Sequence, residues 1–135
     1  MLLMALMKRV KPIQRAMERV GWIWAAARWL GHDLAGRTLG LVGCGRIGRS
    51  MARRAQGFRM RVLAVDPHAA AATWPEGVER VDTLAHMLPQ CDAVSIQCVL
   101  NPQTRHLLGA AELARMRAGA VLVNVSRGEI VDEAA

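Results

Sequence analysis

The chain has 135 residues, 53% of them hydrophobic, which is the length of about one domain with enough apolar content for a core. Its net charge of +7 raises the question of a nucleic-acid partner. However, tyrosine is absent and there is one phenylalanine, so side chains on which bases can stack are scarce. We therefore expect no nucleic-acid partner.

Residues 1–35 are expected to form a helical lead-in and a linker. A helix is predicted over residues 2–19, although Pro12 interrupts its middle. The apolar stretch 1–7 is too short to span a bilayer, and no basic residues precede it. Neither a membrane-spanning segment nor a signal peptide is therefore expected.

Three tryptophans follow within residues 22–30, a segment that is predicted to be helical or irregular. Trp22, Trp24 and Trp29 present more apolar surface than a small domain easily covers. We expect them to pack either on the flank of this chain or against a partner subunit.

A glycine-rich turn follows the first predicted strand, residues 38–42. Gly43, Gly45 and Gly48 stand as G-x-G-x-x-G. Gly43 permits a tight turn, Gly45 lets a pyrophosphate approach the backbone, and Gly48 lets the next helix pack closely on the strand. That helix, predicted at 46–57, offers unpaired N–H groups to phosphates at its start. The pattern predicts a dinucleotide-binding unit, and a purely structural turn is the alternative.

The second predicted strand, residues 61–65, ends at Asp66, which lies 18 residues beyond Gly48. An acid at about this distance can accept hydrogen bonds from both hydroxyls of the adenosine ribose. Its charge would repel the 2′-phosphate of NADP, so NAD is the favoured cofactor. The alternative is an acid that caps the following loop. His68 is expected to be a loop residue.

The helix after the glycine turn carries arginines at Arg46, Arg49 and Arg53, which fall on one stripe. A solvated helix face and a phosphate-binding surface are both compatible with this pattern.

The remaining segments alternate between helix and strand, with loops or turns between them. We expect a loop at 68–80, a helix at 83–89, a strand at 93–98, a turn at 101–104, a helix at 110–117, a strand at 120–124, a turn at 126–128 and the start of a helix at 132–135. This alternation predicts an α/β fold with a Rossmann-type, doubly wound parallel sheet over residues 36–135. Ligands bind beyond the carboxyl ends of such strands.

Two further residues at predicted strand ends are candidates for the site. Thr104 can reach a cofactor phosphate or merely cap the turn after Pro102. Arg127 follows an apolar strand, and its guanidinium can hold a carboxylate or polarise a carbonyl that receives hydride. A structural ion pair of Arg127 with Glu129 or Asp132 is the alternative.

The three cysteines, Cys44, Cys91 and Cys98, have neither C-x-x-C nor metal-ligand spacing, so no metal site is expected. We expect Cys91 and Cys98 to pack as small apolar residues and Cys44 to be partly exposed. An odd number of cysteines suits a reducing compartment, and we therefore expect a cytoplasmic protein.

Four motifs together resemble the D-isomer-specific 2-hydroxyacid dehydrogenases, a family that includes phosphoglycerate dehydrogenase. They are the stretches 39–48, 65–67, 101–105 and 124–133, of which the last has no general explanation in dinucleotide-binding folds. The resemblance covers nearly the whole chain. It implies the NAD-binding domain of an oxidoreductase that transfers hydride between NAD(H) and a D-2-hydroxy acid or 2-keto acid.

The resemblance also implies roles for individual residues. The pyrophosphate would contact Arg46 and Ile47, and the ribose would contact Asp66. Cys98 and Thr104 would flank the cofactor. The nicotinamide and the substrate would be contacted from the last motif, by Val125, Ser126 and Arg127, with Arg127 the substrate-binding and catalytic arginine.

In this family a histidine supported by a glutamate transfers the proton, and both follow the arginine. All four histidines here precede Arg127, so the chain is expected to be a fragment that lacks this pair and is inactive alone. Val99 stands where many members have proline, and Gln97 where many have histidine. The family also implies a homodimer. A non-catalytic NAD-sensing module is the alternative function.

Overall fold

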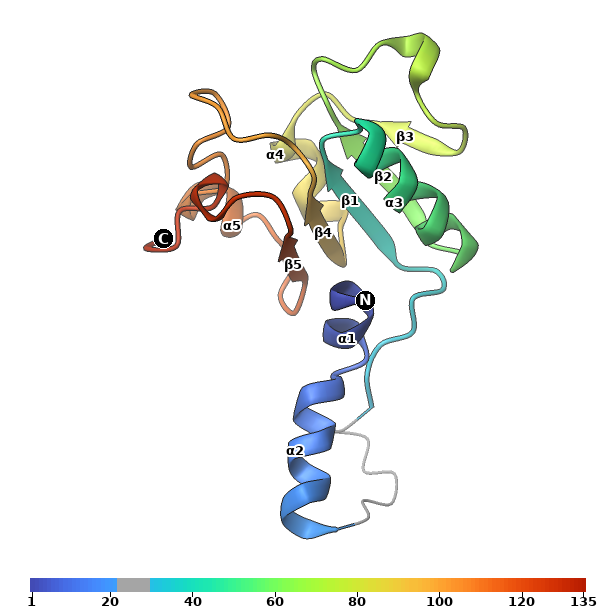
Figure 1. Ribbon diagram of the computed structural model, residues 1–135, viewed down its shortest axis with the longest axis vertical. Coiled ribbons are helices and arrows are strands. Elements are labelled where there is room, and N and C mark those ends of the chain that lie inside the picture. The colour runs from blue at the N-terminus through green and yellow to red at the C-terminus, as the bar shows by residue number, and fades with distance from the viewer. Residues whose placement is uncertain (22–29) are drawn as a thin grey trace.

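The computed structural model describes residues 1–21 and 30–135. In this part of the chain five strands form one parallel sheet in the order β3-β2-β1-β4-β5 (Figure 1). The strands are β1 (Thr38–Val42), β2 (Arg61–Val65), β3 (Val78–Arg80), β4 (Ala93–Ile96) and β5 (Val121–Asn124). The helices are α1 (Leu2–Met7), α2 (Val10–Val20), α3 (Arg46–Gly57), α4 (Leu84–Met87) and α5 (Ala110–Leu113), with short 3₁₀ turns η2 (Ala71–Thr73), η3 (Leu88–Gln90) and η4 (Gly128–Ile130). The predicted parallel sheet is confirmed.

The central strand β1 is buried along its whole length, because a layer covers each face of the sheet. Leu39 and Leu41 point to one face, where α1 and α3 pack. The opposite face is covered by α4 and by the segments around Leu108 and Ile130. Because the strands are parallel, the glycine turn and the ends of β2 and β4 lie at one edge of the sheet, beside the buried central strand.

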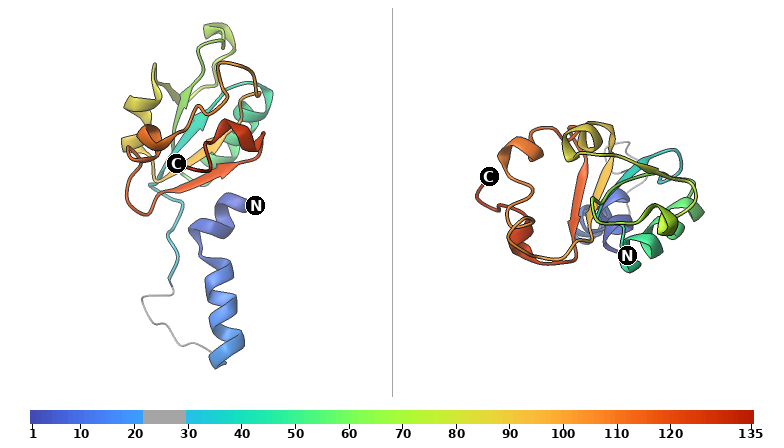
Figure 2. Two further views of the ribbon diagram at one scale, coloured as in Figure 1. Left: turned by 90° about the vertical axis from the view of Figure 1, so that its left-hand side faces the viewer. Right: turned by 90° about the horizontal axis from the view of Figure 1, so that it is seen from above.

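The lead-in differs from the single helix predicted over residues 2–19. The helix breaks at Arg9, whose φ of 53° is left-handed, so that α1 and α2 are separate (Figures 1 and 2). Pro12 then falls in the first turn of α2, where a backbone N–H would have no helical partner. Leu3 and Met7 of α1 are buried against the sheet, whereas α2 projects away from it and buries Ala16 alone among its residues.

Three other local predictions were wrong. The predicted loop 68–80 contains β3, a strand too short to give a sequence pattern. The helix predicted at 110–117 ends at Leu113, because the next turns use i→i+3 hydrogen bonds. No helix begins at 132–135, since Asp132 accepts a hydrogen bond from the N–H of Ala134 and closes a turn instead. The Trp22, Trp24 and Trp29 cluster lies outside the described residues.

Candidate functional site

Two of the three glycines in the turn between β1 and α3 are required by packing. Gly43 has a φ of 99°, and a Cβ there would lie 2.9 Å from the backbone nitrogen of Cys98. A Cβ on Gly48 would lie 2.3 Å from the carbonyl oxygen of Gly43. The turn and the close approach of α3 to the strand therefore both depend on the absence of side chains, as predicted.

Gly45 differs, because a Cβ on it would meet no protein atom within 4 Å. Its φ of −69° is also open to any residue. Gly45 is the N-cap of α3, where the first N–H groups of a helix lack helical partners and favour anions. The protein's own packing thus gives no reason for glycine here, whereas a phosphate that approaches the start of α3 would need the space.

Asp66 is held at the end of β2 by three backbone donors. Its carboxylate accepts hydrogen bonds from the N–H groups of Cys44 at 2.7 Å, His68 at 2.9 Å and Ala69 at 3.1 Å. Asp66 therefore caps the following loop, which was the predicted alternative. The same bonds pin the carboxylate against the glycine turn, which fixes its position at the edge of the sheet.

A cleft of about 540 Å³ opens at this edge, a size in the range of small-molecule sites. The structure brings together in its lining five of the residues predicted for the site: Gly43, Gly45, Asp66, Cys98 and Thr104. Sequence reasoning missed the contribution of Asp82, Thr83 and Leu84. These three follow β3, and once that strand is recognised they stand at a strand end like the others.

Thr104 closes the turn that begins at Asn101. Its hydroxyl accepts a hydrogen bond from the N–H of Asn101 at 2.8 Å and donates one to the carbonyl of Val99 at 2.6 Å. The predicted capping role is therefore observed. Because Thr104 also lines the cleft, its contact with a cofactor stays a prediction.

A second hollow, of about 380 Å³, lies beside the cleft and contains two further predicted residues. Ile47 at the start of α3 and Val125 after β5 both line it, and they are 62% and 54% exposed. Gln97 lines both hollows, so it stands between them. The two hollows together extend from the end of β2 past β1 and β4 to the end of β5.

The last predicted residues lie on the turn after β5, outside the cleft. Asn124 shapes this turn, since its side chain accepts a hydrogen bond from the Ser126 N–H at 3.0 Å and donates one to the Arg127 carbonyl at 2.8 Å. Sequence reasoning missed Asn124, although asparagine is a usual turn former. The guanidinium of Arg127 is exposed and donates to the carbonyl of Ser126 at 3.2 Å.

The predicted alternative for Arg127, an ion pair with Glu129 or Asp132, is not present in the described part of the chain. Glu129 pairs instead with Arg105 at 3.0 Å. Arg46 does not line the cleft and lines a separate hollow on α3 instead. Its predicted contact with a pyrophosphate would therefore be made by its backbone N–H at the start of the helix.

Burial disfavours the thiolate form of all three cysteines. Cys44 is 3% exposed, so the prediction that it is partly exposed was wrong, and burial raises its pKa. Burial likewise raises the pKa of Cys98, and that of Cys91 to about 11. All three stay protonated near neutral pH and pack as small apolar groups. Residues 1–21 and 30–135 contain no cluster of acidic, cysteine and histidine residues that could hold a metal ion.

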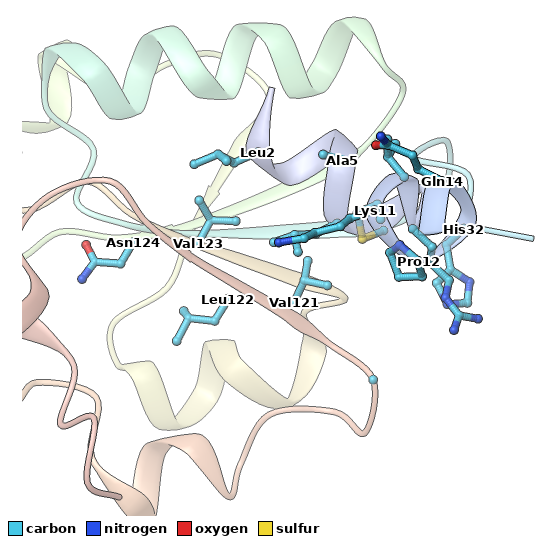
Figure 3. A pocket seen from close by; sticks show the side chains of 15 residues that line it. Leu2, Ala5, Lys11, Pro12, Gln14, His32, Val121, Leu122, Val123 and Asn124 are labelled. Atoms are coloured by element: carbon cyan, nitrogen blue, oxygen red, sulfur yellow. The ribbon is translucent and has the colours of Figure 1, made fainter. Parts of the chain in front are cut away.

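A larger hollow, of about 920 Å³, lies at the opposite end of the strands between the lead-in and β5 (Figure 3). Leu2 and Ala5 of α1 face Val121 and Val123 of β5 across it. It shares Leu2 and Val123 with the second hollow, and its walls are mainly apolar. In the described part of the chain no helix is long and apolar enough to cross a membrane.

The sheet order, the glycine turn and the acid at the end of β2 define a Rossmann-type dinucleotide-binding domain. The open space at Gly45 and the fixed carboxylate of Asp66 fit an adenine dinucleotide. Residues 1–135 match the family described as "D-isomer specific 2-hydroxyacid dehydrogenase, NAD binding domain". The chain belongs to this family, whose cofactor is NAD.

Known relatives agree with this assignment. The chain is 44% identical over 137 residues to a glyoxylate reductase from Korarchaeum cryptofilum, covering 99% of this chain and 41% of that protein. It matches the apo-structure of D-lactate dehydrogenase from Escherichia coli with a TM-score of 0.86 and 36% identity, over 98% of this chain and 41% of that one. An NAD-complexed dehydrogenase of the family from Lactobacillus delbrueckii matches with a TM-score of 0.88, at 26% identity, over 98% of this chain and 40% of that one. The chain thus spans about two-fifths of the length of these relatives.

Proposed function

We propose that this chain is the cofactor-holding part of an NAD-dependent D-2-hydroxyacid dehydrogenase. The bound nicotinamide would supply or accept the hydride that passes to or from C2 of a 2-keto or 2-hydroxy acid. The observation that carries this proposal is the pairing of an open backbone position at Gly45 with a carboxylate fixed at Asp66.

Different residues of the cleft would contact different parts of NAD. Asp66 would accept hydrogen bonds from the adenosine ribose, and the start of α3 would receive the pyrophosphate beside Gly45. Cys98 and Thr104 would flank the cofactor from the end of β4. Val125 and Ser126 would lie by the nicotinamide, in and beside the second hollow, because the two hollows meet at Gln97. Ile47 would contact the pyrophosphate at the start of α3.

Arg127 would bind the substrate carboxylate and polarise its carbonyl. Its exposed guanidinium stands at the end of β5 on a turn that Asn124 holds, and the described residues offer it no acidic partner. A planar guanidinium in such a place can form two parallel hydrogen bonds to a carboxylate. It also stabilises negative charge that develops on a carbonyl oxygen.

Reduction of a 2-keto acid also needs a proton for the new alkoxide, from a group that titrates near the working pH. The resembled family places a glutamate and a histidine after the arginine, whereas His32, His68, His86 and His106 all precede Arg127. We therefore expect this chain to bind NAD without turning over substrate.

We further propose that the protein is cytoplasmic and forms a homodimer through the lead-in. Exposed apolar side chains on α1 and α2 support this pairing, since Leu6, Val10 and Val20 are 48%, 51% and 73% exposed. Light scattering at high protein concentration tests the association. A homogeneous monomer would contradict it.

The test of the enzymatic proposal is an NADH-absorbance assay of this chain with hydroxypyruvate, glyoxylate and phosphohydroxypyruvate. We expect binding of NADH without turnover. Robust turnover that disappears in Arg127→Ala would show that the chain contains its own proton donor.

A glutamate and a histidine encoded after Ala135 in the parent gene would support the proposal that the parent protein is a dehydrogenase. Their absence there would favour a non-catalytic NAD-sensing module.

A further inference from the structure

The exposed face of α3 carries a hollow that is separate from the cleft described above. It has a volume of about 320 Å³ and is lined by Arg46, Arg49, Arg53, Thr73 and Pro75. None of these residues lines the 540 Å³ cleft. The wall opposite α3 is the loop between β2 and β3, which contains η2 (Figure 1).

The three arginines of this hollow have no acidic partners in the described part of the chain. By contrast, Arg37, Arg61, Arg105 and Arg117 each pair with a carboxylate. Arg49 is half-buried and donates a hydrogen bond to the carbonyl oxygen of Thr73 at 3.1 Å, which leaves other N–H donors of its guanidinium available. Three like charges therefore face one concave surface without compensation, a condition that a bound anion relieves.

The loop wall is held in place before any ligand arrives. Besides the bond from Arg49, the side chain of Gln56 donates to the Glu76 carbonyl at 2.8 Å, and the Trp74 indole donates to the Val78 carbonyl at 2.8 Å. These bonds tie the loop to α3 and β3. A preformed wall reduces the entropy that binding would otherwise cost.

We propose that this hollow binds a compact polyanion with adjacent phosphoryl groups. At about 1.5 Å of helix rise per residue, Arg46 lies about 4.5 Å from Arg49 and about 10.5 Å from Arg53 along the axis. That spread suits a short chain of phosphoryl groups better than one phosphate. A nucleic acid is disfavoured because the Trp74 ring is covered by Arg80, whose guanidinium carbon lies 5.0 Å from the ring centroid.

The test is calorimetric titration of the 135-residue chain with sodium tripolyphosphate at about 0.1 M salt, where charges beyond about 10 Å are largely screened. We expect saturable binding at one site, weakened about tenfold in Arg49→Gln and in Arg53→Gln. Arg115→Gln is the matched control, because Arg115 is exposed and lies outside every described hollow. It should bind tripolyphosphate as the unsubstituted chain does.

A repeat of the titration with saturating NADH separates the two sites. Tripolyphosphate should still bind, because Arg46 contributes its side chain to the hollow and only its backbone to the proposed cofactor site, and Arg49 and Arg53 do not line the cleft. Loss of binding under NADH would assign the anion to the cofactor cleft and overturn the proposal. An equal loss in Arg115→Gln, no saturable binding, or tighter binding of a short DNA duplex would overturn it as well. Urea unfolding of each variant shows whether a loss of binding is a loss of fold.

Discussion

The two ends of the candidate site are built differently. At the end of β2 the carboxylate of Asp66 is fixed by three backbone N–H groups inside a cleft. At the end of β5 the guanidinium of Arg127 is exposed and bonded to the carbonyl of its own neighbour. From this contrast we predict that the chain contains the groups needed to bind the cofactor. The half that would handle the substrate needs further groups to position its arginine.

The largest effect on stability is expected from Gly48→Ala, which would disrupt the glycine turn at the cofactor-binding end of the site. The new Cβ would lie 2.3 Å from the Gly43 carbonyl oxygen, a backbone atom that cannot move without opening the turn. We expect a loss of about 3 kcal/mol in the free energy of unfolding, measured by urea titration. A change below about 0.5 kcal/mol would contradict the packing role of Gly48.

Gly45→Ala is the matched substitution three residues earlier, and it distinguishes an effect on folding from an effect on cofactor binding. No protein atom lies within 4 Å of the new Cβ, so the urea midpoint should stay nearly unchanged. The methyl group would occupy the space proposed for the pyrophosphate. NADH binding, followed by fluorescence titration, should weaken about tenfold or more. Unaltered binding would remove Gly45 from the cofactor site.

Asp66→Asn tests the charge at the fixed end without removing the loop cap. The amide oxygen can still accept from the N–H groups of His68 and Ala69, as Oδ1 of Asp66 does, whereas the bond from Cys44 and the repulsion of a 2′-phosphate are lost. The preference for NAD over NADP should narrow by about tenfold. Asp66→Ala is the companion variant, and it should also destabilise the loop because three N–H groups lose their acceptor. An unchanged preference in Asp66→Asn would show that another group selects the cofactor.

A smaller effect is expected from Asp92, which lies at the opposite edge of the sheet. It accepts a hydrogen bond from the Thr38 N–H at 2.8 Å and pairs with Arg37 and Arg117. Burial opposes ionisation, but the Thr38 N–H and the two arginines offset it, so the pKa of Asp92 lies below the usual 3.8. The stabilisation is therefore present above about pH 4 and is lost as the pH falls through the lowered value.

Asp92→Asn should cost about 1 kcal/mol at pH 7 and should reduce the loss of stability between about pH 5 and pH 3. Urea unfolding of both proteins across this range measures the difference. NADH affinity at pH 7 should not change, because Asp92 is remote from the cleft. Parallel acid profiles of the two proteins would contradict the ionic role of Asp92.

The smallest effect is expected from Arg127→Ala on cofactor binding. Its side chain is exposed and does not line the cleft, so NADH affinity should change less than about twofold. Arg127→Lys serves as the control that keeps the charge. A large loss of NADH affinity in the alanine variant alone would place Arg127 in the cofactor site. It would contradict the division into a cofactor-binding end at β2 and a substrate-binding end at β5.

The same contrast explains how far the sequence could predict the molecule. The bounds of β1, α3 and β2 were predicted as they occur, because apolar runs and glycines mark them on both sides. Of the residues that line the cleft, Gly43, Gly45 and Asp66 were predicted for the same reason, whereas Cys98 was named from the family resemblance. The strand β3 was missed because three residues, of which Val78 alone is buried, carry no periodic signal.

Side-chain partners were harder to predict than element bounds, since they depend on contacts between distant segments. The bond from the Cys44 N–H to Asp66 joins the ends of two strands, and it accompanies the burial of a cysteine expected to be partly exposed. The pairing of Glu129 with Arg105 rather than Arg127 likewise depends on how the 101–104 turn packs beside η4. The spacing of residues in the sequence predicts neither this hydrogen bond nor this ion pair.

The most direct test of the account is calorimetric titration of the 135-residue chain with NAD and with NADP under identical conditions. A cofactor-binding half that is complete within the chain predicts saturable binding of NAD at one site per chain, tighter than that of NADP. If the folded chain binds neither nucleotide, or binds NADP as tightly as NAD, then the cleft around Gly45 and Asp66 is not a self-sufficient NAD site.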